Sequence, residues 1–318
     1  MMLRQLEYLV ALAQEGHFGR AAQACHVTQP ALSAGIRKLE SELGVRVVRR
    51  GQRFEGFTPE GAEVLTWAQR MLAERTSLTQ TLDSMRDGLS GTLRIGAIPT
   101  ALSMSALLTG RVRQEHPLVR FRIESSTSRE IVRRVNDYEI DAGLTYIDGE
   151  PLGTVRTVPL YRERYLLLSP APEGAAEADA APGVDDEPAT WEEAAASPLC
   201  LLTPDMQNRR ILEGHLTEAG GPVDVIVEAD TISAIYAHVV AMGLSSVVAH
   251  TWVATLGIPA GMRVRRLPDP KRGVHVGIVL AGQGPEPLLA RALVDAVRDL
   301  DLDGLLKPAV DPLGAPLG

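Results

Sequence analysis

The chain has 318 residues, of which 45% are hydrophobic and 23% charged, and its formal net charge is −8. This length exceeds the usual size of one domain, so we expect two or three folding units with a sizeable buried core. Its two cysteines, Cys25 and Cys200, exclude a disulfide framework and a cysteine-rich metal site.

The sequence lacks the pattern of a secreted or membrane protein. No basic leader precedes an apolar core at the N-terminus, and no apolar run approaches the roughly 20 residues that span a bilayer. We therefore expect a cytoplasmic protein without membrane contact. Charge is unevenly distributed, because residues 1–58 carry eight Arg or Lys against five Glu, a net of +3, which leaves −11 for the rest. A small basic module can bind phosphates locally, since charge effects fall off over about 8–10 Å.

The first elements predicted are three short helices. Apolar residues recur at helical spacing over about residues 4–14, and the stretch FGRAAQACH predicts a second helix followed by a turn at residues 26–28. Thr28 is a suitable N-cap for a third helix, with Pro30 in its first turn. The expected core face of that helix is Leu32, Ile36, Leu39 and Leu43. Its opposite face presents Gln29, Ser33, Ala34 and Arg37.

Two short helices joined by a tight turn are typical of the helix-turn-helix, whose second helix enters the major groove N-terminus first. Gln29 and Ser33 can reach base edges there, and Arg37 can reach guanine or a phosphate. An ordinary surface helix would also have a polar face. The following stretch, VRVVRRGQRFEGFT, favours DNA binding, because it alternates like a β-ribbon and carries four arginines suited to phosphate, as a wing would.

The segment HFGRAAQACHVTQPALSAGIRKLESELGVRVVRR, followed by FTPEG, resembles the winged helix-turn-helix of LysR-type transcriptional regulators over about the first 65 residues. Within that family, EYLVALA and CHVTQPALS resemble the OxyR-like subgroup. The positions at Ala34, Gly35 and Val48 depart from the family's usual residues, which concerns base preference more than fold. The DNA-binding residues implied are Thr28, Gln29, Pro30, Ser33, Arg37, Arg49, Arg50 and Arg53.

Residues 59–87 predict one long helix, capped by Thr58 and running without a breaker to Gly88. An apolar seam with steps of four and three, as in a heptad repeat, runs along Val64, Ala68, Met71, Leu78, Leu82 and Met85, with Arg75 as its one charged interruption. Such a seam either packs on its own domain or pairs with a second copy. The resemblance favours pairing, which would present two helix-turn-helix modules to DNA half-sites about one turn apart. It also implies that dimers associate into tetramers.

From Thr92 the pattern alternates between strands and helices, as in βαβ units with a parallel sheet. The order then repeats, which predicts two similar α/β lobes and a periplasmic-binding-protein-like domain of type 2, the sensory domain that the resemblance implies. The fold class is therefore mixed. The predicted divisions are a winged helix-turn-helix (1–58), a linker helix (59–88), a regulatory domain (89–302) with a solvated connector (170–189), and a flexible tail (303–318).

An effector site is predicted between the lobes. In open α/β sheets, ligands bind beyond the carboxyl ends of the strands, where helix N-termini offer free N–H groups. The resemblance points to the same loops, and simple helix capping is the alternative for each polar residue. The expected contacts are Thr100, Ala101, Thr127, Ser128, Thr203, Gln207, Asn208 and Ser233. We expect a small anion there, such as a carboxylate, and neither a cofactor nor a metal.

Other functions are less consistent with the sequence. The motifs of hydrolases, P-loop proteins and zinc proteases are missing, so we expect no enzyme. A solute-binding protein would need an export signal. A thiol switch of the OxyR kind would need cysteines in the second lobe, where this chain reads LLTPDMQNRRIL and where Cys200 lies in an apolar strand. The expected partners are double-stranded DNA, a second copy of the chain and the effector, with RNA polymerase as a further partner open to such a regulator.

Overall fold

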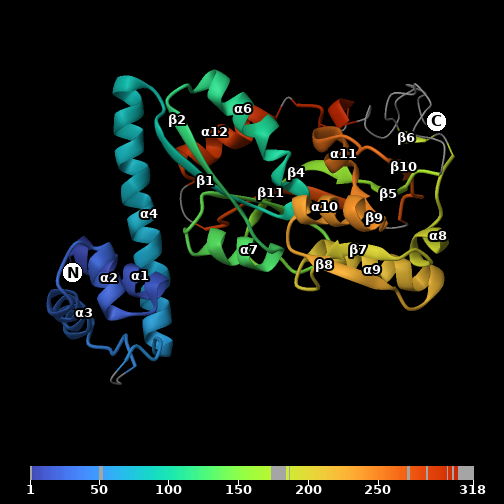
Figure 1. Ribbon diagram of the computed structural model, residues 1–318. Coiled ribbons are helices and arrows are strands. Elements are labelled where there is room, and N and C mark those ends of the chain that lie inside the picture. Colours follow the sequence, from blue (N-terminus) through green and yellow to red (C-terminus); the bar gives the residue numbers. More distant parts are fainter. Residues whose placement is uncertain are drawn as a thin grey trace. The chain divides into compact units, whose positions relative to one another are not determined.

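The computed structural model describes residues 2–49, 53–172, 184–185, 187–270, 273–283, 286–298, 300–302 and 304–306. The chain divides into two compact units (Figure 1). One is formed mainly by Met1–Ser90 and the other by nearly all later residues. Among the described residues, no helix has the length and apolarity needed to cross a membrane, and no group of three or more His, Cys, Asp or Glu could hold a metal ion.

Three short helices open the N-terminal unit: α1 (Leu3–Glu15), α2 (Phe18–Ala24) and α3 (Gln29–Leu43). The caps explain their boundaries. Gly16 ends α1 with a φ of 59°, and His17 Nδ1 accepts a hydrogen bond from the Gly19 N–H at 3.0 Å to begin α2. Thr28 Oγ1 accepts from the Ala31 N–H at 3.4 Å, so the predicted cap of α3 is confirmed. The helices share a buried core made of Ala11, Leu12, Ala21, Ala22, Leu32 and Ile36.

The predicted core face of α3 is correct at three positions and wrong at the fourth. Leu32, Ile36 and Leu39 are buried, but Leu43 is 40% exposed because the helix ends there, at Gly44 with a φ of 70°. The wing is also less regular than predicted. Its described residues form one isolated antiparallel bridge, between Val48 and Phe57, in place of a ribbon. Arg50 lies outside the described residues.

The linker helix is α4 (Pro59–Asp87), and Thr58 Oγ1 caps it by accepting from the Gly61 N–H at 2.9 Å. The apolar seam divides into two halves. In the first, Ala68 is 1% exposed and joins the core formed by Leu6, Leu9, Leu39 and Val47. In the second, the exposed side chains are Leu78, Leu82 and Met85. Pairing with a second copy through this second half stays a prediction.

The first lobe of the larger unit is a five-stranded sheet in the order β2-β1-β3-β11-β4. Its strands are β1 (Gly91–Ala97), β2 (Val119–Ser125), β3 (Ala142–Tyr146), β4 (Arg156–Glu163) and β11 (Val274–Leu280). The accompanying helices are α5 (Pro99–Leu102), α6 (Ser105–Glu115), α7 (Ser128–Asn136) and α12 (Leu288–Val297). Strand β1 pairs in parallel with β2 and β3, whereas β11 runs antiparallel to β3 and β4.

The second lobe contains a sheet in the order β6-β10-β5-β9 and a parallel pair, β7-β8. Its strands are β5 (Tyr165–Pro170), β6 (Val184–Asp185), β7 (Leu199–Leu202), β8 (Val225–Ala229), β9 (Ser246–Ala249) and β10 (Met262–Arg266). Its helices are α8 (Trp191–Ala195), α9 (Gln207–Gly220), α10 (Ile232–Met242) and α11 (His250–Leu256). The buried core includes Leu166, Cys200, Val248 and Trp252.

Three predictions for this unit need correction. The sheets are mixed and not simply parallel, because the chain leaves the first lobe through β4 and returns to it through β11, and both crossing strands have antiparallel neighbours. The connector is not solvated throughout, since β6 pairs with β10 and Ala189 is 1% exposed. The tail is not entirely free either, because Leu306 is 3% exposed. Residues 173–183 and 307–318 lie outside the described residues.

Candidate functional site

The polar face of α3 is free of the protein core. Thr28, Gln29, Pro30 and Arg37 are exposed and Ser33 is half-buried, whereas Leu32 and Ile36 between them are buried. The N-cap at Thr28 fixes the start of the helix, so these side chains lie at the N-cap and in the first three turns of α3. This is the arrangement that a helix needs in order to present its N-terminal end to a DNA groove.

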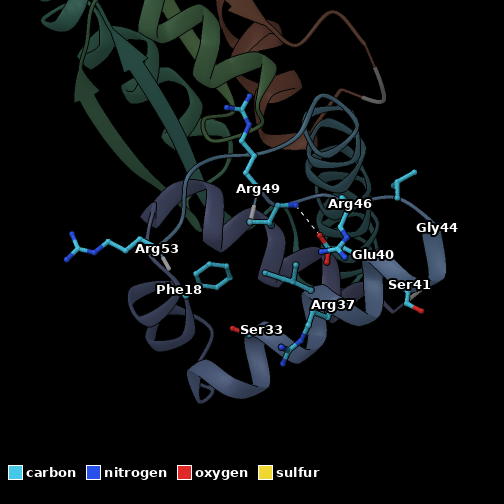
Figure 2. Close-up of a pocket in the computed structure, with 12 residues that line it drawn as sticks. Phe18, Ser33, Arg37, Glu40, Ser41, Gly44, Arg46, Arg49 and Arg53 are labelled. Carbon is cyan, nitrogen blue, oxygen red and sulfur yellow. Dashed lines mark hydrogen bonds between the residues drawn. The ribbon is translucent and has the colours of Figure 1, made fainter. Parts of the chain in front are cut away.

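A groove of about 800 Å³ adjoins this face, and Figure 2 shows the side chains around it. Helix α3 contributes Ser33, Arg37 and Glu40, and the wing contributes the remaining arginines. We call this feature the arginine groove. The full lining is Phe18, Ser33, Ile36, Arg37, Glu40, Ser41, Gly44, Val45, Arg46, Val48, Arg49 and Arg53.

The charge of the arginine groove is strongly positive, since four arginines line it against one carboxylate. Glu40 has a positioning role, because its Oε1 accepts from the backbone N–H groups of Val47 at 2.9 Å and Val48 at 3.1 Å. This carboxylate fastens the wing to α3.

Arg46 lines the groove but was not among the DNA-contacting residues predicted. The signal that could have found it is its place in the same alternating stretch as Arg49.

Gly35 is explained by the close packing of α3 against α1, on the side of α3 opposite the arginine groove. A Cβ at this position would lie 2.6 Å from Cδ2 of Tyr8, so the glycine lets the ring of α1 pack directly against α3. The departure from the family pattern at this position therefore concerns helix packing. A glycine inside a helix costs about 1 kcal/mol relative to alanine.

Replacing Arg53 with alanine is expected to weaken specific and non-specific DNA binding alike and to lower the salt slope by about one unit, because an exposed wing arginine acts mainly on phosphates. Titrations at several salt concentrations measure the slope, with Arg111→Ala, an equal charge change on α6, as control. A changed sequence preference at an unchanged slope would show instead that the wing reads bases.

The two lobes meet at a buried polar cluster formed by Thr100, Tyr146, Glu163 and Asn208, which we call the interlobe cluster. Thr100 Oγ1 lies 3.2 Å from the Tyr146 hydroxyl, and Asn208 Nδ2 donates to that hydroxyl from the second lobe at 3.0 Å. The Thr251 hydroxyl, also from the second lobe, donates to the Thr100 carbonyl at 3.0 Å. The predicted residues Thr100 and Asn208 are thus brought together across the lobe boundary.

Glu163 is the residue that the sequence reasoning missed. It is 1% exposed at the end of β4, where the chain crosses between the lobes, and its Oε1 accepts from the Tyr146 hydroxyl at 2.6 Å. Burial raises the pKa of Glu163 to about 7, although the hydrogen bond from Tyr146 opposes this shift. Burial likewise lowers the pKa of the neighbouring His250 to about 4, which keeps that imidazole neutral.

The other predicted effector residues differ in their surroundings. Gln207 is 3% exposed and its Nε2 donates across the boundary to the Asp148 carbonyl at 3.0 Å. Ala101 and Ser128 are buried, and Thr203 is half-buried. Thr127 Oγ1 accepts from the Glu130 N–H at 3.3 Å, so it caps α7. Ser233 is exposed, and its hydroxyl bonds to Thr231 Oγ1 at 3.4 Å on the first turn of α10.

A salt bridge also joins the two lobes beside Gln207. Glu150 of the first lobe receives Arg210 Nε at 2.8 Å from the second lobe and Arg129 Nε at 3.2 Å from its own lobe. Both carboxylate oxygens are therefore engaged by arginines near the starts of α7 and α9.

Both cysteines lie in surroundings that disfavour a thiolate. Cys200 is fully buried in β7, and burial raises its pKa to about 11. Cys25, half-buried at the end of α2, has a pKa raised by burial and by Glu7. A reactive thiol is instead expected to have a lowered pKa and solvent access.

Comparisons with known proteins cover both units. The family described as "Bacterial regulatory helix-turn-helix protein, lysR family" matches residues 3–62, and "LysR substrate binding domain" matches residues 86–301. The "DNA-binding transcriptional dual regulator OxyR" of Escherichia coli (strain K12) is 29% identical over 321 residues, covering 98% of this chain and 100% of the relative. A "Hydrogen peroxide-inducible genes activator" of Dickeya chrysanthemi is 34% identical over 164 residues, covering 51% and 53%.

Solved structures show the same fold. A full-length OxyR variant from Pseudomonas aeruginosa is 27% identical with a TM-score of 0.70, covering 95% of this chain and 99% of that chain. Full-length CbnR in a complex with its target DNA is 20% identical with a TM-score of 0.62, covering 94% and 99%.

Proposed function

Because the chain belongs to the family of LysR-type transcriptional regulators and carries their helix-turn-helix and effector-binding domains, we propose that α3 and the arginine groove bind a specific operator. A small anionic effector bound between the lobes switches this binding. The observation that carries the DNA-binding part is the arginine groove itself, which joins the exposed start of α3 to a wing of positive charge. Bases are read by α3 while phosphates lie along the groove.

Arg37→Ala, or Ser33→Ala, is expected to weaken operator binding by about 1–3 kcal/mol, because both side chains line the arginine groove on the face of α3 proposed to meet the DNA. A mobility-shift titration measures the loss, with size-exclusion chromatography to verify an unchanged oligomer. If both variants bind the operator as tightly as the wild type, α3 does not take part in base recognition through these side chains.

The effector part of the proposal is supported by the boundary between the lobes. Thr100 and Asn208 share a hydrogen-bonded hydroxyl there, and Gln207 reaches across from the first turn of α9. Helix N-termini favour anions through their free N–H groups and dipole. A ligand that prefers one arrangement of the lobes over another shifts the equilibrium between them and thereby the DNA-binding state.

Oxidant alone is expected to leave operator binding unchanged, and Cys200→Ser is expected to behave like the wild type, because burial holds this thiol protonated. Thr100→Ala should abolish the effector response while operator binding without effector survives. Mobility shifts with and without peroxide make the comparison. A peroxide response of the wild type that disappears in Cys200→Ser would contradict the ligand switch and support a thiol switch.

The remaining parts of the proposal follow from DNA binding. The exposed residues Leu78, Leu82 and Met85 of α4 pair with a second copy, and a dimer matches two half-sites of an operator. Tetramers and contact with RNA polymerase extend the same proposal. The protein acts in the cytoplasm, where its DNA is, and works by binding and not by catalysis.

A further inference from the structure

The strand that crosses between the lobes presents three buried polar side chains on one face. Tyr161, Glu163 and Tyr165 alternate with Arg162 and Arg164, and the first three are 2%, 1% and 2% exposed. Side chains at every second position of an extended strand point the same way. The interlobe cluster is therefore built on the crossing segment itself, and a negative charge on Glu163 would lie in the middle of the site proposed for an anion.

Two acceptor oxygens at the lobe boundary are buried without a hydrogen-bond partner among the described residues. They are Glu163 Oε2 and Gln207 Oε1. The hydroxyl of Tyr165, on the same face of the strand, also interacts with the Glu163 carboxylate and lowers its pKa. The orientation of the Gln207 amide is fixed, because its Nε2 donates to the Asp148 carbonyl, so its oxygen must be the free end. Asn208, next to Gln207 on α9, lies 3.4 Å through Nδ2 from Glu163 Oε1, so the first turn of α9 carries one of these acceptors and contacts the carboxylate that carries the other.

Donors suited to an acidic group lie at the first turns of α7 and α9. Ser128, 4% exposed at the start of α7, has an unpartnered hydroxyl. Helix α9 begins at Gln207, and Met206 at the N-cap position provides no side-chain cap, so the first-turn N–H groups are left for a ligand. Buried polar groups are normally paired, and a set of unpaired acceptors beside unpaired donors is what a bound molecule with both kinds of group would complete.

We propose that the effector is a zwitterionic amino carboxylate, such as an amino acid, whose ammonium group is held by Glu163 and Gln207 and whose carboxylate is held by the donors at the starts of α7 and α9. This inference rests on the proposed switch between the lobes and names a zwitterion, in place of a simple anion, as the class of its effector. An ammonium group offers three donors and one positive charge, so it pairs both free acceptors and compensates the buried carboxylate. A simple anion would do neither.

The test uses the full-length protein and a panel of proteinogenic amino acids, each with its desamino carboxylate and its decarboxylated amine. Thermal shift identifies binders, since a ligand of the folded state raises the unfolding temperature, and calorimetry measures their affinities. An amino acid is expected to bind about 100-fold more tightly than its desamino carboxylate, in line with a charged hydrogen bond made at a buried site.

Glu163→Gln is expected to lower the amino acid affinity about 100-fold and to leave the desamino carboxylate unaffected, because glutamine keeps the acceptor used by Tyr146 but loses the charge. Gln207→Met should reduce the amino acid affinity in the same direction, which guards against a folding defect in the first variant. Glu218→Gln, an exposed charge change on α9, is the control and should bind like the wild type.

The inference is overturned if no amino acid binds, or if desamino carboxylates bind as tightly as their amino counterparts. The proposed function fails separately. If a desamino carboxylate binds at Thr100 and switches operator affinity, the proposed function is supported. The proposal that the effector carries an amino group is then contradicted. An amino acid that binds through Glu163 without changing operator affinity supports the ligand class and contradicts the switch.

Discussion

Glu163→Gln is expected to remove a fall in stability that the wild-type regulatory unit undergoes between about pH 4.5 and 7. The folded-state pKa of Glu163 is raised from 4.5 to about 7, so in this window the unfolded chain releases a proton that the folded chain keeps. Stability is then full below the unfolded pKa and declines as pH rises toward the folded pKa. At 1.36 kcal/mol per unit, the decline amounts to about 3 kcal/mol.

Urea unfolding of wild type and variant at pH 5 and pH 8 measures this difference, which should favour the variant at pH 8 relative to pH 5. Glutamine can still accept from the Tyr146 hydroxyl, so the comparison isolates the charge. Glu228→Gln is the control, because Glu228 pairs with Arg209 at a side-chain exposure of 44% and does not belong to the interlobe cluster. Parallel pH profiles for Glu163→Gln and the wild type would mean that Glu163 titrates normally in the folded protein.

Local signals in the sequence were sufficient for the helix-turn-helix. Thr28 and Pro30 define the start of α3 by backbone chemistry that depends on neighbouring residues alone. The same signals failed at Leu43, because periodicity does not say in which turn a helix leaves the core. They also gave no sign that Glu40 fastens the wing, since a glutamate on a polar helix face ordinarily points to solvent.

The interlobe cluster was only half predictable. Thr100 and Asn208 follow from the rule that ligands bind beyond strand ends, and the structure brings them together at Tyr146. Glu163 was not found, because the pattern YRERY reads as an exposed charged stretch until the second lobe covers one face of it. Its hydrogen-bonding neighbours include Asn208, 45 positions away, which no local window contains. Ser233, predicted by the same rule at a helix start of the second lobe, stays exposed.

Gly61→Ala is expected to destabilise the N-terminal unit by about 3 kcal/mol and to weaken operator binding as well. A Cβ at Gly61 would lie 2.0 Å from the Val47 carbonyl oxygen and 2.8 Å from its carbon, so α4 and the start of the wing could not keep their present distance. The obstacle is backbone and cannot rotate away. The same carbonyl accepts from the Thr58 N–H at 3.0 Å, and moving it would break the junction that begins α4.

The loss of DNA binding follows because Val47 and Val48 hold the wing to Glu40, so their displacement moves Arg46 and Arg49 away from α3. Urea unfolding and mobility shifts measure the two effects together.

Two other glycines make matched controls. Gly110→Ala on α6 meets open space and should gain up to about 1 kcal/mol of stability from helix propensity. Gly35→Ala meets only the Tyr8 ring, which can turn aside, so it should cost less than Gly61→Ala. If Gly61→Ala unfolds and binds operator like Gly110→Ala, the close junction between α4 and the wing does not position the arginine groove.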